Sequence, residues 1–220
     1  LISERPDVIL NIVDGTNIER NLYLSTQLME LGIPVVMAVN MMDVVERNGD
    51  RIHVDQLSEK LGCEAVEVSA LKGTGIDRVA AKTLMAARKA ETGALHEFSE
   101  EVELAVHNVM ERLGSEVEEA GRRFYAIKLL ERDDKIPEQL KRVPDVSAEI
   151  NGLEKSFDDD TESIITNERY TFISSIMDEC LTKGSRDKLT TSDKIDKIVT
   201  NRFLALPIFA AVMFIVYYVL

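Results

Sequence analysis

VVMAVNMMD, residues 35–43, decides the fold class, because a continuous run of apolar, strand-forming residues ends there in polar ones. Such runs are typical of parallel strands in a sheet that helices cover on both faces. VILNIV, residues 8–13, has the same character, and residues 65–68 form a third, shorter run. Strands of this kind, separated by longer segments, predict an α/β domain with a parallel sheet.

Helical periodicity fills the segments between these strands. Apolar spacing predicts helices over residues 19–31, 54–61 and 76–88, and Gly32 and Gly62 end the first two. Because strand and helix alternate, we expect right-handed crossover connections between neighbouring parallel strands. We assign residues 1–92 to this α/β domain.

The following residues lack strand signals and predict a second domain that is all-α. Amphipathic spacing indicates helices over residues 100–113, 116–130, 147–157 and 162–181. The acidic triplet Asp158-Asp159-Asp160 precedes the last of them, and carboxylates favour the N-terminal turn of a helix. We therefore interpret the triplet as a helix start rather than a cation site, and assign residues 93–200 to the helical domain.

The run Phe203–Leu220 carries no charge. A membrane-spanning helix needs roughly 20 apolar residues, and a soluble core helix rarely stays apolar on every face. We therefore expect residues 201–220 to be the start of a transmembrane helix rather than a buried core helix. Basic residues precede it and, by the positive-inside rule, place the N-terminal domains in the cytoplasm: Lys183, Arg186, Lys188, Lys194, Lys197 and Arg202.

Composition excludes some classes of partner. The formal net charge is -13, and no basic stripe is present of the kind that neutralises phosphates, so nucleic acid is not an expected partner. Cys63 and Cys180 are far apart and form no C-x-x-C pair. That usage is typical of a reducing, cytosolic setting.

Polar residues follow the second and third strands, at the sheet edge where α/β proteins bind ligands. They are Asn40-Met41-Met42-Asp43 and Ser69-Ala70-Leu71. The Asp43 carboxylate can accept two hydrogen bonds at once from guanine, whose ring N1–H and exocyclic amine form a donor pair that adenine lacks. Either element alone could be a helix cap or an ordinary turn. Both together, each after an apolar strand, favour guanine binding.

The two elements resemble the base-recognition motifs of the GTPase superfamily, Asn-Lys-x-Asp and Ser-Ala-Lys/Leu. By that resemblance, Asn40 contacts N7 of the base and ties neighbouring loops together. The Ala70 backbone N–H reaches guanine O6, while Ser69 fixes the loop that continues through Leu71. Met41 stands where the superfamily usually has lysine, a departure that argues for weaker nucleotide affinity rather than for a different base.

A longer resemblance points to one family. NIVDGTNIERNLYL, residues 11–24, resembles the stretch NIVDATNLERNLYL of the ferrous iron transport protein B family, FeoB. In that family methionine is the usual residue at the position of Met41. Further matching stretches, which reach the family's entry into its first membrane helix, are residues 32–36, 40–43, 167–173, 193–198 and 206–209.

FeoB proteins join a cytosolic GTPase domain, a helical spacer and a membrane domain that passes Fe²⁺ inward. The resemblance implies that residues 1–92 are the C-terminal part of a P-loop GTPase domain, 93–200 the spacer and 201–220 the start of the first membrane helix. It implies GTP or GDP as ligand, guanine recognition coupled to iron uptake, and the cell (inner) membrane as location. The implied partners are the lipid bilayer, Fe²⁺ through the membrane domain, and small cytosolic Feo accessory proteins.

No phosphate loop of the form G-x-x-x-x-G-K-[ST] occurs in these residues. Phosphoryl transfer depends on positioned phosphates and metal, so we expect this chain to hydrolyse no GTP by itself. GTPase activity and Mg²⁺ binding are expected only of the full-length protein. His53, His96 and His107 fit no metal-ligand spacing, so we assign neither catalytic nor metal-binding residues.

Two alternatives remain open from the sequence. The first is a soluble, RNA-related GTPase, which would share both base-recognition elements but would usually carry a basic RNA-binding module. The second is a membrane-tail-anchored helical adaptor whose nucleotide site is degenerate. Guanine nucleotide titration separates the adaptor from a GTP-binding protein, and RNA in a purified complex would favour the first alternative.

Overall fold

The computed structural model describes residues 4–89, 96–184 and 205–219. The chain forms two compact units, residues 1–182 and 183–220. The α/β part of the first unit contains β1 (Ile9–Asp14), α1 (Ile18–Glu30), β2 (Val35–Asn40), α2 (Met42–Arg47), β3 (Arg51–Ile52), α3 (Val54–Leu61), β4 (Glu64–Glu67) and α4 (Ile76–Lys89). Its helical part contains α5 (Glu100–Leu113), α6 (Arg122–Leu130), α7 (Ser147–Phe157) and α8 (Thr161–Cys180), and ends in β5 (Leu181–Thr182).

The main sheet is parallel, as the apolar runs predicted. Its strand order is β1-β2-β4, with Asp14 opposite Asn40 and Val39 opposite Glu67. Because the three strands are parallel, their carboxyl ends meet at one edge of the sheet. The polar residues after β2 and β4 are therefore brought to the same edge.

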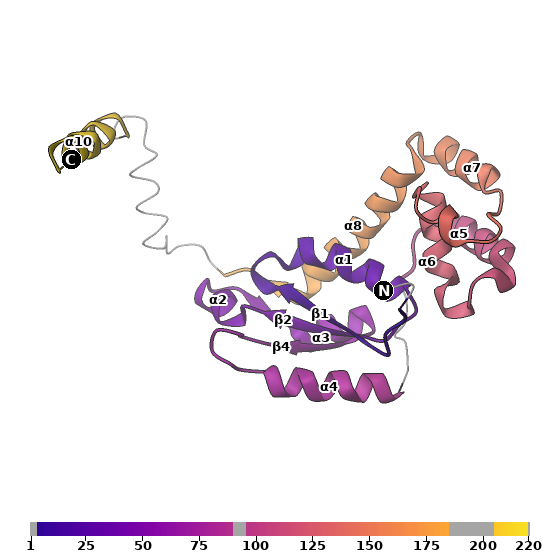
Figure 1. The fold of residues 1–220 in the computed structure, drawn as a ribbon, viewed down its shortest axis with the longest axis horizontal. Coiled ribbons are helices and arrows are strands. Elements are labelled where there is room, and N and C mark those ends of the chain that lie inside the picture. The colour runs from indigo at the N-terminus through magenta and orange to yellow at the C-terminus, as the bar shows by residue number, and fades with distance from the viewer. Residues whose placement is uncertain (1–3, 90–95, 185–204, 220) are drawn as a thin grey trace. The chain divides into compact units, whose positions relative to one another are not determined.

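Helices cover both faces of the sheet, with α1 on one side and α4 on the other (Figure 1). Side chains alternate between faces along a strand. Val35, Met37 and Val39 accordingly belong to the core that contains α1 and α3. Val36 and Ala38 belong to a smaller core with Val79 of α4. This two-sided burial explains why β2 reads as an unbroken apolar run.

One face of β1 stays open within the described residues. Leu10 is 41% exposed and Ile12 is 64% exposed, whereas Ile9, Asn11 and Val13 between and beside them are buried. The alternation shows that β1 packs against α1 on one face only, in contrast to β2.

Two boundaries in the helical domain differ from the sequence prediction. The helix expected over residues 116–130 begins only at Arg122, because Gly114–Glu116 and Glu119–Gly121 form separate 3-10 turns. Gly114 has φ +48°, a value that ends an α-helix and favours glycine. The helix expected over 162–181 ends at Cys180, and Leu181–Thr182 form the strand β5, which the sequence did not predict.

A buried ion pair joins the α/β part to the helical domain. Arg169 of α8 donates from Nε and Nη2 to the two carboxylate oxygens of Glu30 on α1, at 3.2 and 2.9 Å. Both side chains have 0% exposure. Beside this pair the Tyr23 and Tyr170 rings stack, with centroids 5.1 Å apart. Buried charges are costly unless they are paired, so this contact specifies how α1 and α8 meet.

The second unit contains α10 (Ala205–Val219). The expected start of a transmembrane helix, residues 201–220, extends beyond the described part of this helix at both ends. Among the residues that the structure describes, no helix combines the length and the apolar character needed to span a membrane.

Candidate functional site

The sequence-predicted site residues gather at the carboxyl edge of the main sheet. Asn40 is the last residue of β2, Asp43 lies in the first turn of α2, and Ser69 follows β4. Backbone hydrogen bonds hold the two loops together, since Met42 N–H donates to the Val68 carbonyl at 3.3 Å. The fold therefore places both predicted motifs side by side.

Ser69 and Asp43 are in direct contact. The Ser69 hydroxyl donates to Oδ1 of Asp43 at 2.7 Å, and its oxygen accepts from the backbone N–H of Lys72 at 3.3 Å. Ser69 is only 3% exposed, so surrounding atoms hold its hydroxyl in place. This hydrogen bond, aided by the positive charges of Lys72 and Arg47, lowers the pKa of Asp43. The carboxylate is therefore ionised at neutral pH and acts as an acceptor.

Asn40 and Ala70 also meet, in an arrangement that the sequence did not predict. The Ala70 backbone N–H donates to the Asn40 side-chain oxygen at 3.0 Å. This N–H is the donor that the GTPase resemblance directs toward guanine O6. A bound base would have to replace or share this hydrogen bond, so Asn40 occupies the Ala70 donor in this conformation.

The loop after Ser69 is closed by a short bridge. Ser69 and Thr74 exchange two backbone hydrogen bonds of 3.1 Å each. Gly75 then passes close to the end of β4, where an added Cβ would lie 2.1 Å from the Glu67 carbonyl oxygen, and its φ is +80°. Only glycine combines that backbone conformation with that close approach. The sequence predicted a glycine loop here but not its role in holding Ser69.

Met41 and Leu71 lie differently from the polar members of the site. Met41 has φ +62° and ψ +26°, an unusual left-handed conformation for this side chain, and is 43% exposed. Leu71 is 90% exposed. Neither side chain offers a polar atom that binds a base edge strongly. The left-handed turn at Met41 directs the chain from β2 into α2 and so sets the position of Asp43 in the first turn of that helix.

A third polar turn lies at the same edge, after β1. The Asp14 carboxylate oxygen Oδ1 accepts from the backbone N–H and the hydroxyl of Thr16 at 2.8 and 2.7 Å. Gly15 sits against β2, and a Cβ added there would lie 2.8 Å from the Asn40 carbonyl oxygen. The sequence predicted a turn here, but only the register of Asp14 opposite Asn40 brings it beside the predicted site.

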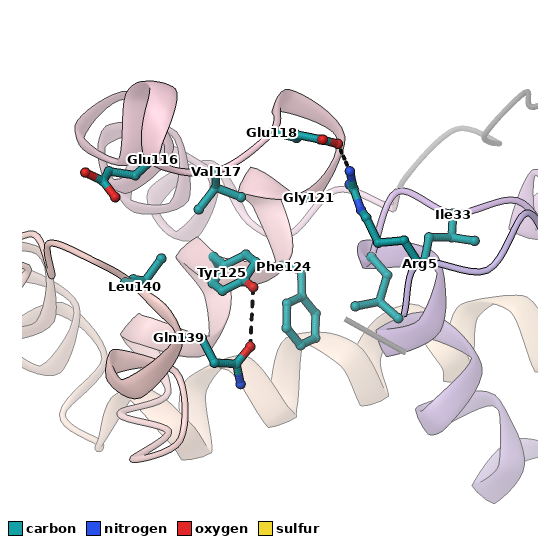
Figure 2. A pocket seen from close by; sticks show the side chains of 11 residues that line it. Arg5, Ile33, Glu116, Val117, Glu118, Gly121, Phe124, Tyr125, Gln139 and Leu140 are labelled. Atoms are coloured by element: carbon teal, nitrogen blue, oxygen red, sulfur yellow. Dashed lines mark hydrogen bonds and ion pairs between the residues drawn. The ribbon is translucent and has the colours of Figure 1, made fainter. Parts of the chain in front are cut away.

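One hollow lies elsewhere, between the end of α1 and α6 (Figure 2). This cavity of about 210 Å³ is lined by apolar side chains such as Leu31 and Phe124. The Tyr125 hydroxyl faces Gln139 Oε1 at 3.3 Å. Ligand pockets usually measure roughly 300–1,000 Å³ and converge several polar groups. This hollow is smaller, and it lies away from the sheet edge where the predicted site residues meet.

Among the described residues, no cluster of three or more His, Cys, Asp or Glu side chains could hold a metal ion. The three histidines are instead distributed over separate elements. His53 bonds Thr182, His107 lies near Glu111 on α5, and His96 is buried beside Glu30.

The parallel sheet and the polar residues at its carboxyl edge together define a class of protein: an α/β domain of the G-domain type, joined to a helical domain. Comparison with family models agrees with this class. Residues 1–83 match the model "Ferrous iron transport protein B", and residues 98–182 match the model "FeoB cytosolic helical domain".

Individual relatives support the same assignment. The chain is 32% identical over 219 residues to the Fe(2+) transporter FeoB of Escherichia coli strain K12, covering 99% of this chain and 28% of that protein. It is 35% identical over 230 residues to a Fe(2+) transport protein A/Fe(2+) transporter FeoB fusion protein of Porphyromonas gingivalis, covering 97% of this chain and 27% of that protein. The chain thus spans just over a quarter of these curated relatives.

A solved structure matches most of the first unit. The NFeoB protein of S. thermophilus, crystallised with GDP.AlF4- and K+, superposes with a TM-score of 0.76 at 43% identity. The match covers 80% of this chain and 70% of that one. The chain therefore belongs to the ferrous iron transport protein B family.

Proposed function

We propose that this chain is the guanine-recognising part of a GTP-binding cytosolic region in a ferrous iron transporter. The observation that carries the proposal is the hydrogen bond from Ser69 to Asp43, which fixes an ionised carboxylate at the carboxyl edge of a parallel sheet. The family membership supports the transporter assignment, and the nucleotide in the S. thermophilus relative supports the ligand.

Each predicted residue has a role in this proposal. Asp43 accepts the ring N1–H and the exocyclic amine of guanine, while Ser69 sets the direction of the carboxylate. Ala70 donates its backbone N–H to guanine O6 while sharing it with the Asn40 side-chain oxygen. Asn40 then contacts the base and links the loop after β2 to the loop after β4. Met41 and Leu71 lie along the apolar face of the purine.

We assign the remaining steps of the transport cycle to the full-length protein. We propose GTP hydrolysis with Mg²⁺, attachment to the inner membrane with these domains in the cytoplasm, and Fe²⁺ passage through a membrane domain. Small cytosolic Feo proteins are proposed accessory partners. Guanine recognition at Asp43 would couple to iron uptake through the helical domain, since α8 contacts α1 at a buried ion pair.

The test is a change of base preference. Calorimetric titration of the full-length protein should show binding of GDP and binding of xanthosine diphosphate weaker by about a hundredfold, because the carboxylate faces an oxygen in xanthine. Asp43→Asn should reverse this order, since its amide can donate to that oxygen.

Glu46→Gln is the matched control, because Glu46 is an exposed carboxylate on the same short helix. This variant should keep the preference for GDP. If Asp43→Asn binds both nucleotides in the original order, Asp43 does not read the base. If the unmodified protein binds neither, the adaptor interpretation with a degenerate site is correct.

A further inference from the structure

The end of the helical domain returns to the α/β part and pairs with it. Strand β5 runs antiparallel to β3, with Arg51 opposite Thr182 and Ile52 opposite Leu181. The pairing continues at His53, whose backbone N–H donates to the Cys180 carbonyl at 2.8 Å. A chain segment that leaves the helical domain is therefore part of a sheet with a loop of the α/β domain.

Side chains reinforce this short ladder. The imidazole Nε2 of His53 lies 3.0 Å from the Thr182 hydroxyl, within hydrogen-bond distance. Ile52 and Cys180 are 2% and 0% exposed, so the ladder is anchored in the core. A two-stranded pair is marginal by itself in water, and these buried contacts are what hold it closed.

The strand β3 is also tied closely to the proposed guanine site. Asp43 lies in the first turn of α2, and residues 44–50 connect it to β3. That connection is rigid, because the backbone N–H groups of Asn48 and Asp50 donate to the carbonyls of Val44 and Val45 at 2.9 and 3.1 Å. Val45 is itself buried at 2% exposure. A displacement of β3 would therefore reach α2 and its carboxylate.

We propose that the β3–β5 pairing is a latch that links the guanine site to the chain beyond Thr182. While the pairing is closed, α2 holds Asp43 against Ser69. When displacement of the chain after Thr182 opens it, α2 loses the support that β3 gives it, and the carboxylate is positioned only by the remaining loop contacts, such as that of the Met42 N–H with the Val68 carbonyl. The inference rests on the proposed base-binding role of Asp43. Thermodynamic reciprocity then requires that a bound guanine nucleotide also favour the closed latch.

Amide hydrogen exchange of the encoded-length protein tests the latch directly. Saturating GDP should slow exchange at the backbone N–H groups of residues 51–53 and 181–182 by about tenfold, a typical size for coupling between two sites. Exchange in α7, which contacts neither the site nor the ladder, should stay unchanged. If GDP binds and exchange at the ladder does not slow, the latch is refuted while guanine binding stands. If GDP does not bind, the proposed function fails first.

Variants provide a second, independent readout. Thr182→Pro removes a ladder N–H and the hydroxyl that faces His53, and should weaken GDP binding by about tenfold. Lys183→Pro, one residue beyond the strand, is the matched control and should bind GDP as the unmodified protein does. Thr182→Val keeps the strand and removes only the hydroxyl, so its affinity for GDP should lie between those of Thr182→Pro and Lys183→Pro. Equal affinity in Thr182→Pro and Lys183→Pro would overturn the latch.

Discussion

Two carboxylates of this protein, Glu30 and Asp43, illustrate opposite uses of the same chemical group. Glu30 is fully buried at the junction of α1 and α8, where Arg169 satisfies both of its oxygens. Asp43 lies at an open sheet edge, where the Ser69 hydroxyl donates to one oxygen. The first carboxylate is occupied by the protein itself, whereas the second has one oxygen held by Ser69, and we propose that it binds guanine.

Their pKa values differ for the same reason. Burial raises the pKa of Glu30, although the Arg169 charge acts against that rise. The hydrogen bond from Ser69 lowers the pKa of Asp43, because a donor favours its charged form, and this effect, with the charges of Lys72 and Arg47, outweighs the partial loss of solvent. Glu30, which joins the domains, thus depends mainly on the charge of Arg169 to stay ionised. Asp43 keeps its charge without a salt bridge.

The largest loss of stability is expected for Arg169→Met, which removes the cation of the buried ion pair with Glu30. Glu30 would remain buried without its cation, and such a broken pair costs about 3–5 kcal/mol in the free energy of unfolding. Urea denaturation followed by circular dichroism measures this loss. Arg132→Met is the control, because Arg132 pairs with Glu154 at 2.7 Å but its side chain is 54% exposed. Such a surface pair contributes about 0–1 kcal/mol, so a similar loss in both variants would contradict our interpretation of Arg169.

A pH titration sharpens the comparison through His96, whose ring is fully buried beside Glu30. Burial and the nearby charges of Arg123 and Arg169, which outweigh Glu103, lower the pKa of His96 to about 4. The unfolded chain takes up this proton near pH 6.5. The unfolded state therefore binds more protons between pH 6.5 and 4, and stability must fall as the pH falls through that window.

His96 should lower the free energy of unfolding at pH 5 by about 2 kcal/mol relative to pH 7.5. Glu30 has a raised pKa and contributes with the opposite sign, so the measurement must isolate the histidine. His96→Gln keeps Glu30 and the size of the side chain but removes the titrating ring. The difference in the free energy of unfolding between the unmodified protein and His96→Gln should shrink as the pH falls. A difference that is constant from pH 7.5 to 5 would show that His96 is protonated normally.

The smallest effect is expected at the open edge, for Ser69→Ala. Removal of the hydroxyl leaves the Asp43 charge in place but releases its orientation, and the lost hydrogen bond should weaken GDP binding by about tenfold or less. Calorimetry measures the affinity, and the preference for guanine over xanthine should persist because Asp43 is intact. Ser69→Thr retains a hydroxyl and should recover most of the affinity. If Ser69→Ala binds GDP normally, the carboxylate needs no orienting donor.

Local sequence patterns predicted the main strands well. The expected runs 8–13 and 65–68 are each shifted by one residue from β1 and β4, and the run 35–39 is one residue shorter than β2. A strand that is buried on both faces, as β2 is, carries an apolar signal in every residue, so a short window suffices to find it. The positions of Asn40, Asp43 and Ser69 followed, because polar residues just beyond such strands must lie at the sheet edge. Their proposed roles with guanine stay predictions.

Short and distant pairings were not predictable in this way. The strands β3 and β5 have two residues each, too few for any periodicity. The side-chain contact beside them, between His53 and Thr182, joins residues that are 129 positions apart. Arg169 appeared in the sequence as one basic residue of a helix, and its partner Glu30 lies 139 positions away. The residues next to Arg169 and Glu30 in the sequence do not indicate that either charge will be buried.

The sequence by itself determined the α/β class, the helical domain, the family and the residues offered at the sheet edge, because apolar periodicity and motif spacing are local properties of the chain. Only the tertiary structure decided which groups those residues meet. Asn40 holds the Ala70 N–H, Glu30 is neutralised by Arg169, and β5 closes on β3. Burial and long-range pairing set these contacts, and both depend on the whole fold rather than on neighbouring residues.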